Sequence, residues 1–498
     1  MKADQNSRQH DYLQKIDDLR DNMIEDLRGF LSIRSVKSEP AEGAPFGEGV
    51  REAFQYMLDL GQREGFTCEN IDDYGGHIDF EASGNTAAGD GSADADDIIN
   101  APEVMGILCH LDVVPEGNDW DHDPYGADVE DGCIFGRGTL DDKGPTMAAF
   151  YAMKALKDCG YKPEKKIRMV LGLDEETGSQ GIRYYKEKVK MPDFAIVPDA
   201  EFPLVHGEMG ILVFELVKKF RKAPKGSLIL KKISGGNAPN MVPDKAQAVI
   251  SGEREAYAHI KELAAAYALE TGRELSVKGR GSSLEITAPG ISAHGAFPWK
   301  GDNAVSTLME FLGRLEFGCE DQNDFIAFYN EHIGRDLHGE RMGCNLSDEV
   351  SGKLIFNAGM LELDENSGHL TINVRYPITL DDEAVYNSMS PVISKYDIGV
   401  VKSMHEKPIY FPAEDPAVQL LLSIYRKHTG DMETQPLVIG GGTYARQMEN
   451  AIAFGAMYPG DPDLMHQKNE FVKIDRLVQT AKIYAETIYR MAVCPELD

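Results

Sequence analysis

The stretch "GILCHLDVVPEGNDW" (Gly106–Trp120) begins as a core strand and ends in polar residues. Its apolar start, residues 107–109, is typical of a strand inside a sheet. His110 and Asp112 follow two residues apart, and residues at this spacing point to the same side of a strand. An imidazole and a carboxylate at the end of a core strand indicate a site that uses both groups.

The residues after this stretch alternate between strand and helix patterns. Strands are expected at 106–111, 166–173 and 194–198, and a short helix at 181–190. A longer helix starts near Pro145, which fits a first helical turn, and stops at Gly160. Strands that alternate with helices predict an α/β unit whose sheet is covered on both faces.

The middle of the chain has a different pattern. Residues 208–407 include "GILVFELVKKF" and "GHLTINVRYPITL", which alternate apolar and polar residues like strands with one wet face. From residue 408 the α/β pattern returns, with a helix at 416–428, strands at 436–440 and 451–457, and a helix at 473–491. We therefore expect one domain in two segments, 1–207 and 408–498, with an α+β lid domain of residues 208–407 inserted between them.

Composition narrows the classes of partner and compartment. The net charge of −31 argues against nucleic acid or an anionic membrane as a partner. No apolar run reaches the roughly 18 residues of a membrane span, and the polar N-terminus shows no secretory signal. The seven cysteines include no C-x-x-C pair, so we expect reduced thiols and a cytoplasmic protein. The small, acidic segment 84–102 is expected to be a solvated loop.

Carboxylates follow several of the predicted strands, in "LDDKG" (Leu140–Gly144), "LDEETGS" (Leu173–Ser179) and "VPDAE" (Val197–Glu201). Each alone is typical of a helix cap or a solvated turn. The carboxyl ends of parallel strands share one crevice, however, and carboxylates that converge there repel one another. Only Lys143 adds a basic group within these motifs. A pair of cations would balance the charge, and carboxylate with imidazole suits Zn²⁺, Mn²⁺ or Co²⁺.

The chain resembles the M20 metallopeptidases, and within them the dipeptidase V-like, Xaa-His dipeptidase group. The resemblance covers nearly the whole chain and rests on motifs in a fixed order: "HLDVVPEG" (His110–Gly117), "GRGTLDDKGP" (Gly136–Pro145), "DEETGSQG" (Asp174–Gly181), "VPDAE", "NMVPDKA" (Asn240–Ala246), "ISAHGAFPWKGDNA" (Ile291–Ala304), "NVRYP" (Asn373–Pro377), "IGGGTYAR" (Ile439–Arg446) and "HQKNE" (His466–Glu470). It implies a catalytic domain of the zinc-exopeptidase type, with a two-sided mixed sheet and an inserted lid of two subdomains. Segment 84–102 departs from the pattern and touches no motif.

The resemblance also implies a dinuclear metal site, with two zinc ions expected and manganese or cobalt as alternatives. Its ligands would be His110 and Asp199 for one metal, Glu176 and His466 for the other, and Asp141 as the bridge. The peptide bond between Asp141 and Asp142 would be cis.

Further roles follow from the same resemblance. Asp112 would orient the site without binding metal, and Glu175 would be the general base that takes a proton from a water bridging the metals. In the lid, His294 and Asn240 would stabilise the oxyanion. Arg375 would clamp the substrate's C-terminal carboxylate, helped by backbone amides near Gly440 and Gly442.

The expected activity is hydrolysis of unblocked dipeptides. The alternatives are N-acyl amino acid deacylation, which would use the same metals and base, and a catalytically inactive binding protein on the same fold. The long lid predicts a monomer in which half of the lid takes the place of a dimer partner. The identity of the metal in the cell and the preferred substrate side chains stay open.

Overall fold

The computed structural model describes residues 11–83, 103–221 and 226–495. The acidic loop expected at 84–102 therefore lies outside the described residues. The chain divides into two compact units. The first takes its described residues from Met1–His206, Phe411–Leu437 and Gly442–Asp498, and the second consists of Gly207–Tyr410 and Val438–Gly441. The lid was expected at 208–407.

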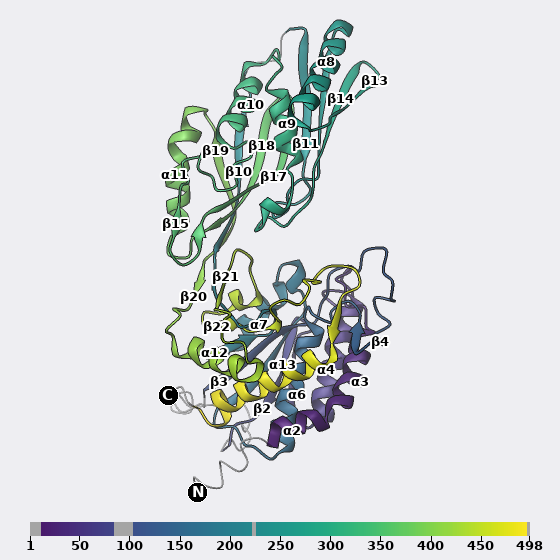
Figure 1. The fold of residues 1–498 in the computed structure, drawn as a ribbon, viewed down its shortest axis with the longest axis vertical. Coiled ribbons are helices and arrows are strands. Elements are labelled where there is room, and N and C mark those ends of the chain that lie inside the picture. The colour runs from purple at the N-terminus through teal and green to yellow at the C-terminus, as the bar shows by residue number, and fades with distance from the viewer. Residues whose placement is uncertain (1–10, 84–102, 222–225, 496–498) are drawn as a thin grey trace. The chain divides into compact units, whose positions relative to one another are not determined.

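The first unit is built on a mixed sheet (Figure 1). Along the sheet the strands are β1 (Thr67–Ile71), β2 (Gly75–Phe80), β6 (Lys166–Gly172), β3 (Val104–His110), β7 (Phe194–Val197), β22 (Ala451–Ala453), β9 (Val205–Glu208) and β20 (Ile409–Tyr410), and β21 (Leu437–Ile439) also pairs with β9. The strands β6, β3, β7 and β22 are parallel neighbours, while β1 and β2 run antiparallel. The prediction of an α/β fold with a mixed sheet is confirmed.

Helices of the first unit share one hydrophobic core with this sheet. They are α2 (Asp11–Asp18), α3 (Arg20–Leu31), α4 (Glu48–Arg63), α6 (Lys143–Asp158), α12 (Pro416–Thr429) and α13 (Ile474–Ile488). Helix α7 (Gln180–Lys188) packs against β2 instead. The strand β3 is apolar because it lies in the middle of the sheet, and every residue from Met105 to His110 is buried. Helix α6 is buried on nearly all sides, which explains its small and apolar sequence.

The strand expected at 451–457 is interrupted. Residues 451–453 form β22, whereas β23 (Ala456–Met457) pairs with β8 (Ala200–Glu201) in a separate small sheet. Gly455 causes the break, because its φ of 75° lies in the left-handed region and the ring of Phe202 occupies the space where a Cβ would stand. A three-stranded sheet of β4 (Asp128–Glu130), β5 (Cys133–Phe135) and β24 (Phe471–Lys473) completes this unit.

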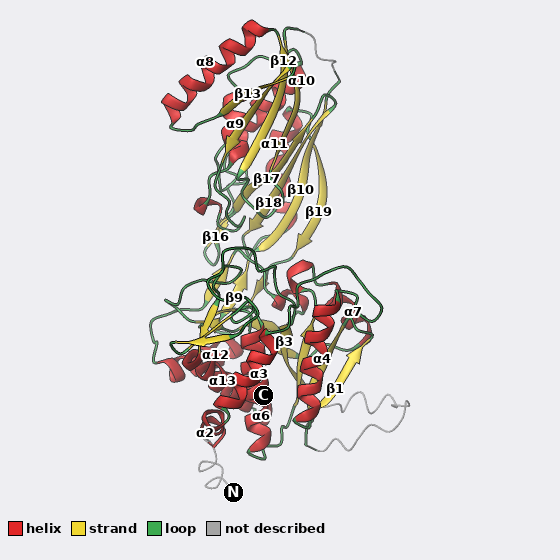
Figure 2. Cartoon of the chain, turned by 90° about the vertical axis from the view of Figure 1, so that its right-hand side faces the viewer, coloured by secondary structure: helices red, strands yellow, loops and turns green. Residues whose placement is uncertain are grey.

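The second unit contains one antiparallel eight-stranded sheet (Figure 2). Its order is β13 (Ser276–Arg280), β14 (Ser283–Pro289), β12 (Lys245–Gly252), β11 (Leu228–Gly235), β17 (Ile355–Leu363), β18 (Ser367–Tyr376), β10 (Gly210–Lys219) and β19 (Gly399–Glu406), and a short hairpin joins β15 (Ser347–Asp348) to β16 (Gly352–Lys353). Its helices are α8 (Arg254–Thr271), α9 (Ala304–Leu312), α10 (Glu320–His332) and α11 (Asp382–Lys395). The two subdomains expected in the lid share this one sheet and one hydrophobic core.

Alternation along β18 separates the two faces of the second sheet. Leu370, Ile372 and Val374 belong to the hydrophobic core, and Arg375 lies on the opposite face.

Among the residues that the structure describes, no helix combines the length and apolar character needed to cross a membrane.

Candidate metal centre

Five side chains gather at the carboxyl ends of the strands of the first unit. His110 ends β3, and Asp199 follows β7. Glu176 lies in a 3₁₀ turn after β6, Asp141 precedes helix α6, and His466 lies in the loop before β24. All five are predicted ligands, and parallel strands bring their ends to one edge of the sheet.

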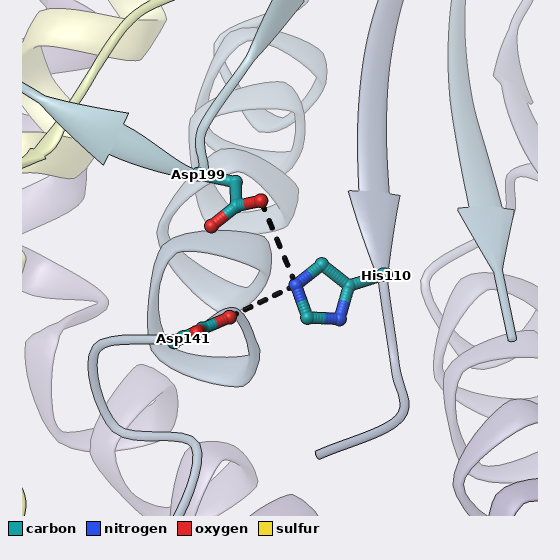
Figure 3. A group of neighbouring side chains, drawn as sticks. All are labelled: His110, Asp141 and Asp199. Atoms are coloured by element: carbon teal, nitrogen blue, oxygen red, sulfur yellow. Dashed lines mark ion pairs between the residues drawn. The ribbon is translucent and has the colours of Figure 1, made fainter. Parts of the chain in front are cut away.

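The ligand atoms form two groups that share one residue. His110, Asp141 and Asp199 form the first, and Asp141, Glu176 and His466 form the second, with the candidate atoms of each group within 4.8 Å of one another. In the first group (Figure 3), His110 Nε2 lies 2.9 Å from Asp141 Oδ1 and 3.8 Å from Asp199 Oδ2. In the second, His466 Nε2 lies 2.9 Å from Asp141 Oδ2 and 3.1 Å from Glu176 Oε1. Asp141 thus offers one oxygen to each group.

The hydrogen bonding of His110 fits a metal ligand. Its Nδ1 lies 3.0 Å from the carbonyl oxygen of Asp112, so Nδ1 carries a proton and Nε2 is the nitrogen that a metal would use. Nε2 and the facing Asp141 Oδ1 are both buried, and neither has a hydrogen-bond partner among the described residues. An imidazole nitrogen and a carboxylate oxygen that face each other in a buried site need a proton or a metal cation between them.

The electrostatics of the carboxylates support the same conclusion. Desolvation raises the pKa of Glu175 to about 8; His110 opposes this shift and Glu176 adds to it. Burial and the nearby Asp141 also raise the pKa of Asp199 well above its usual value. Buried carboxylates of like charge are costly without a positive charge among them. The residues present therefore fit a group of divalent cations.

Lys143 does not supply that positive charge. Its Nζ donates hydrogen bonds to the carbonyl oxygens of Phe30 and Ile33, at 3.0 and 2.6 Å. The side chain is fully buried, and burial lowers its pKa to about 7. Lys143 therefore ties the start of α6 to the end of α3 and leaves the carboxylates without a basic partner from their own motif.

Asp112 joins two of the segments that carry the site. Its Oδ1 accepts a hydrogen bond from the backbone N–H of Glu175 at 3.0 Å, and its Oδ2 accepts one from Glu176 at 3.2 Å. Its Oδ1 also lies 3.5 Å from His110 Nδ1. Asp112 is buried and belongs to neither group of ligand atoms. Its carboxylate holds the 3₁₀ turn of the two glutamates beside His110.

The peptide bond between Asp141 and Asp142 is cis, as the family resemblance implied. Asp142 is fully buried, and its Oδ2 accepts hydrogen bonds from the backbone N–H of His110 and from Thr146 Oγ1, both at 3.2 Å. The two adjacent aspartates therefore have different surroundings. Asp141 faces the ligand groups, and Asp142 links β3 to the first turn of α6.

Two of the predicted lid residues lie on neighbouring loops of the second unit. The backbone N–H of Gly295 donates to the carbonyl oxygen of Asn240 at 2.7 Å, and Met241 forms a β-bridge with His294. Asn357, on strand β17, fixes the backbone on either side of Asn240. Its Nδ2 donates to the carbonyl oxygens of residues 239 and 241. Asn240 and His294 are both exposed.

The residues predicted to bind the substrate's C-terminal carboxylate belong to different parts of the chain. Arg375 is buried on β18, paired in register with Ile211 and Ile355. Gly440 belongs to the second unit and Gly442 to the first. A Cβ on Gly440 would stand 3.2 Å from Ile355 Cδ1, tighter than most such contacts, so a glycine allows close packing there.

Two further residues of the site carried no role in the sequence reasoning. Tyr444 of "GGGTYAR" is fully buried with its ring 6.3 Å from that of His110, and its hydroxyl has no hydrogen-bond partner among the described residues. Glu470, which ends "HQKNE", is also fully buried. Their place inside quoted motifs was the only signal, because neither residue is a ligand.

Comparison with known proteins gives close relatives along the whole chain. A protein of Bacillus subtilis (strain 168) named "Putative dipeptidase YtjP" is 36% identical over 483 residues, which cover 95% of this chain and 98% of the relative. A "Putative dipeptidase" of Staphylococcus aureus (strain USA300) is 38% identical over 488 residues, which cover 96% of this chain and 99% of the relative.

Solved structures share the fold. Human carnosine dipeptidase 1 matches with a TM-score of 0.55 at 15% identity, over 95% of this chain and 96% of that chain. Aminoacylhistidine dipeptidase from Vibrio alginolyticus matches with a TM-score of 0.52 at 17% identity, over 93% and 96%. These likenesses confirm the predicted exopeptidase fold.

The family itself follows from the match to a family model. Residues 106–490, which include every candidate ligand, match the model described as peptidase family M20/M25/M40. Together with the relatives, this match confirms the resemblance and the prediction of a peptidase. The chain belongs to peptidase family M20/M25/M40.

Proposed function

We propose that this chain is a metal-dependent dipeptidase that hydrolyses the single peptide bond of unblocked dipeptides. The observation that carries the proposal is the pair of ligand groups that share Asp141 at the strand ends. The names of the relatives from Bacillus subtilis and Staphylococcus aureus support the choice of dipeptides over other substrates of the family.

The cofactor that we propose is a pair of divalent cations, with zinc expected and manganese or cobalt as alternatives. His110, Asp141 and Asp199 would hold one cation, and Asp141, Glu176 and His466 the other. When bound, such cations polarise a carbonyl group and lower the pKa of water toward neutrality. The imidazole and carboxylate donors, with no thiolate, suit all three metals.

The proton transfer falls to Glu175. Its backbone is fixed by Asp112, and its side chain keeps partial exposure beside the ligand Glu176. In that place its carboxylate would take a proton from the attacking water and pass it to the leaving amine. Gln at this position would keep the shape and lose the base.

In the second unit, His294 and Asn240 are proposed to donate hydrogen bonds to the oxygen that becomes negative as the peptide bond is attacked. Arg375 is proposed to bind the substrate's C-terminal carboxylate through its planar guanidinium, with backbone amides near Gly440 and Gly442. This contact would limit the enzyme to short substrates with a free C-terminus. The length of the lid supports a single chain as the functional unit, and a cytoplasmic location stays a prediction.

The test is metal-depleted enzyme reloaded with Zn²⁺, Mn²⁺ or Co²⁺ and assayed on free dipeptides, a tripeptide and an N-acetyl amino acid. We expect two equivalents of metal per chain and rapid cleavage of the free dipeptides only. Faster hydrolysis of the N-acetyl amino acid would replace the proposal by deacylation. An enzyme that binds metal and cleaves none of these substrates would favour an inactive binding protein.

A further inference from the structure

Glu470 gathers hydrogen bonds from one short stretch of the chain. Its Oε2 accepts from Arg137 Nη1 at 2.6 Å and from the backbone N–H of Gly138 at 3.2 Å. Its Oε1 accepts from the backbone N–H of Leu140 at 2.7 Å and from Thr139 Oγ1 at 3.4 Å. The carboxylate therefore holds the segment that leads directly into Asp141.

The backbone of Glu470 takes part as well. The N–H of Gly136 donates to the carbonyl oxygen of Glu470 at 2.9 Å, and the next residue, Phe471, pairs with Phe135 in the sheet of β24 and β5. Segment 136–140 is thus bound to Glu470 by main chain and side chain together. These contacts join two parts of the sequence 333 residues apart, counted from Arg137 to Glu470.

The charge of Glu470 is balanced by a buried cation. Arg137 is 2% exposed, and its guanidinium lies over the ring of Trp120, 5.3 Å from the ring centre. Removing one partner of a buried ion pair leaves the other charge uncompensated, which is strongly destabilising. Arg137 and Glu470 therefore form one buried ion pair that supports segment 136–140.

The loop that carries His466 is held at the same end. His466 and Asn469 both have φ in the left-handed region, at 62° and 58°. Asn469 makes two hydrogen bonds with Asp121, donating from Nδ2 to Oδ2 at 2.7 Å and accepting at Oδ1 from the backbone N–H at 2.8 Å. Residues 469 and 470 thus anchor a loop whose backbone at His466 is one that non-glycine residues rarely adopt.

We propose that Glu470 is a positioning residue that fixes Asp141 and His466 relative to each other and so sets the affinity of the second ligand group for its metal. The inference rests on the proposed function. Asp141 directly follows Leu140, whose backbone N–H donates to the Glu470 carboxylate. His466 lies four residues before Glu470 in the same loop. The first group should depend less on Glu470, because the main sheet positions two of its three ligands. His110 ends β3, and Asp199 follows β7.

The experiment is a titration of metal-depleted full-length Glu470→Gln with Co²⁺ or Zn²⁺ as the only added ligand. Gln keeps one carbonyl oxygen, but its amide nitrogen faces the N–H donors. The second equivalent of metal should bind roughly 10- to 100-fold more weakly than in the wild type, the range for residues that orient metal ligands. The first equivalent should change less. Excess metal should restore turnover.

A matched control is Glu486→Gln. Glu486 is 3% exposed and also accepts from basic groups, but it lies on α13 and these partners, Lys427 and His428, lie on α12. Its substitution should lower thermal stability and leave both metal affinities unchanged. If Glu470→Gln does not fold, Glu470→Asp keeps the charge toward Arg137 and should weaken the second equivalent by a smaller factor.

Two results would overturn the inference. In one, the Glu470 variants bind both equivalents as tightly as the wild type. In the other, both equivalents weaken equally and excess metal restores nothing, as for a general loss of stability. Failure of the proposed function gives a different result, in which the wild type binds two metals, the variants bind the second one weakly, and no form cleaves dipeptides.

Discussion

The exchange of Asp112 for Asn tests how the catalytic turn is held. Both carboxylate oxygens of Asp112 accept backbone N–H groups, one from Glu175 at 3.0 Å and one from Glu176 at 3.2 Å. Asn keeps one acceptor and places an NH₂ group against the other donor. One of the two bonds is therefore lost, while the volume of the side chain hardly changes.

The size of the effect follows from that count. A hydrogen bond to a charged group contributes about 1.5–3 kcal/mol. Since about 1.36 kcal/mol corresponds to a tenfold change in rate, kcat/KM should fall roughly 10- to 150-fold if the whole loss is felt at the turn. Glu176 is displaced together with Glu175, so the affinity for metal should fall in the same variant.

The assay is kcat/KM on a free dipeptide with metal content measured in the same samples. Asp348→Asn is the control, because Asp348 also accepts backbone N–H groups, from Val350, Ser351 and Thr379, but lies in the second unit. The control should keep wild-type kcat/KM. Wild-type kcat/KM and full metal content in Asp112→Asn would refute the assigned role.

Glu175→Gln should lower kcat by about 10²–10⁴ and still bind two metals; loss of metal with retained turnover would reverse the roles of the two glutamates. Arg375→Ala should lower kcat/KM for dipeptides roughly 10- to 100-fold through KM, and the wild type should cleave amidated dipeptides poorly. Equal rates on amidated and free dipeptides would exclude the clamp. Inactive His294→Ala and Glu175→Gln chains, mixed under exchange conditions, should stay inactive, and recovered activity would show a site shared between chains. Burial lowers the pKa of His77 from 6.5 to about 4. The unfolded chain therefore takes up the proton first, and the free energy of unfolding should fall by on the order of 3 kcal/mol as the pH drops from about 6.5 to 4. Melting curves across this pH range should show the loss, and His77→Gln should make stability depend less on pH.

The structure brings the five predicted ligands together because their positions follow a regular rule. His110 and Asp199 stand where parallel strands end, and the strands were readable from their apolar runs. The spacing of His110 and Asp112 already indicated a shared side. The family resemblance then distinguished Asp141 from Asp142 and Glu176 from its neighbour, which periodicity cannot do.

The supporting contacts could not be read in the same way. The partners of Glu470 lie more than 300 residues earlier in the chain, so no local pattern pairs them. Lys143 stands among carboxylates in sequence, yet its long side chain reaches carbonyl groups at the end of α3. The expected strand at 451–457 is interrupted by packing of the Phe202 ring against Gly455, another contact between distant residues. Contacts between residues so far apart in the sequence depend on tertiary packing.

The position of β22 has a consequence for the order of events during synthesis. This strand, residues 451–453, lies between β7 and β9 in the sheet, although both neighbours are made before residue 209. A ribosome must therefore translate the whole second unit before the gap in the first sheet is filled. Domains usually form in the order in which they emerge. Here the second unit can fold while the first segment of its neighbour, residues 1–206, still has an open sheet. Both β22 and His466 come only with the last tenth of the chain.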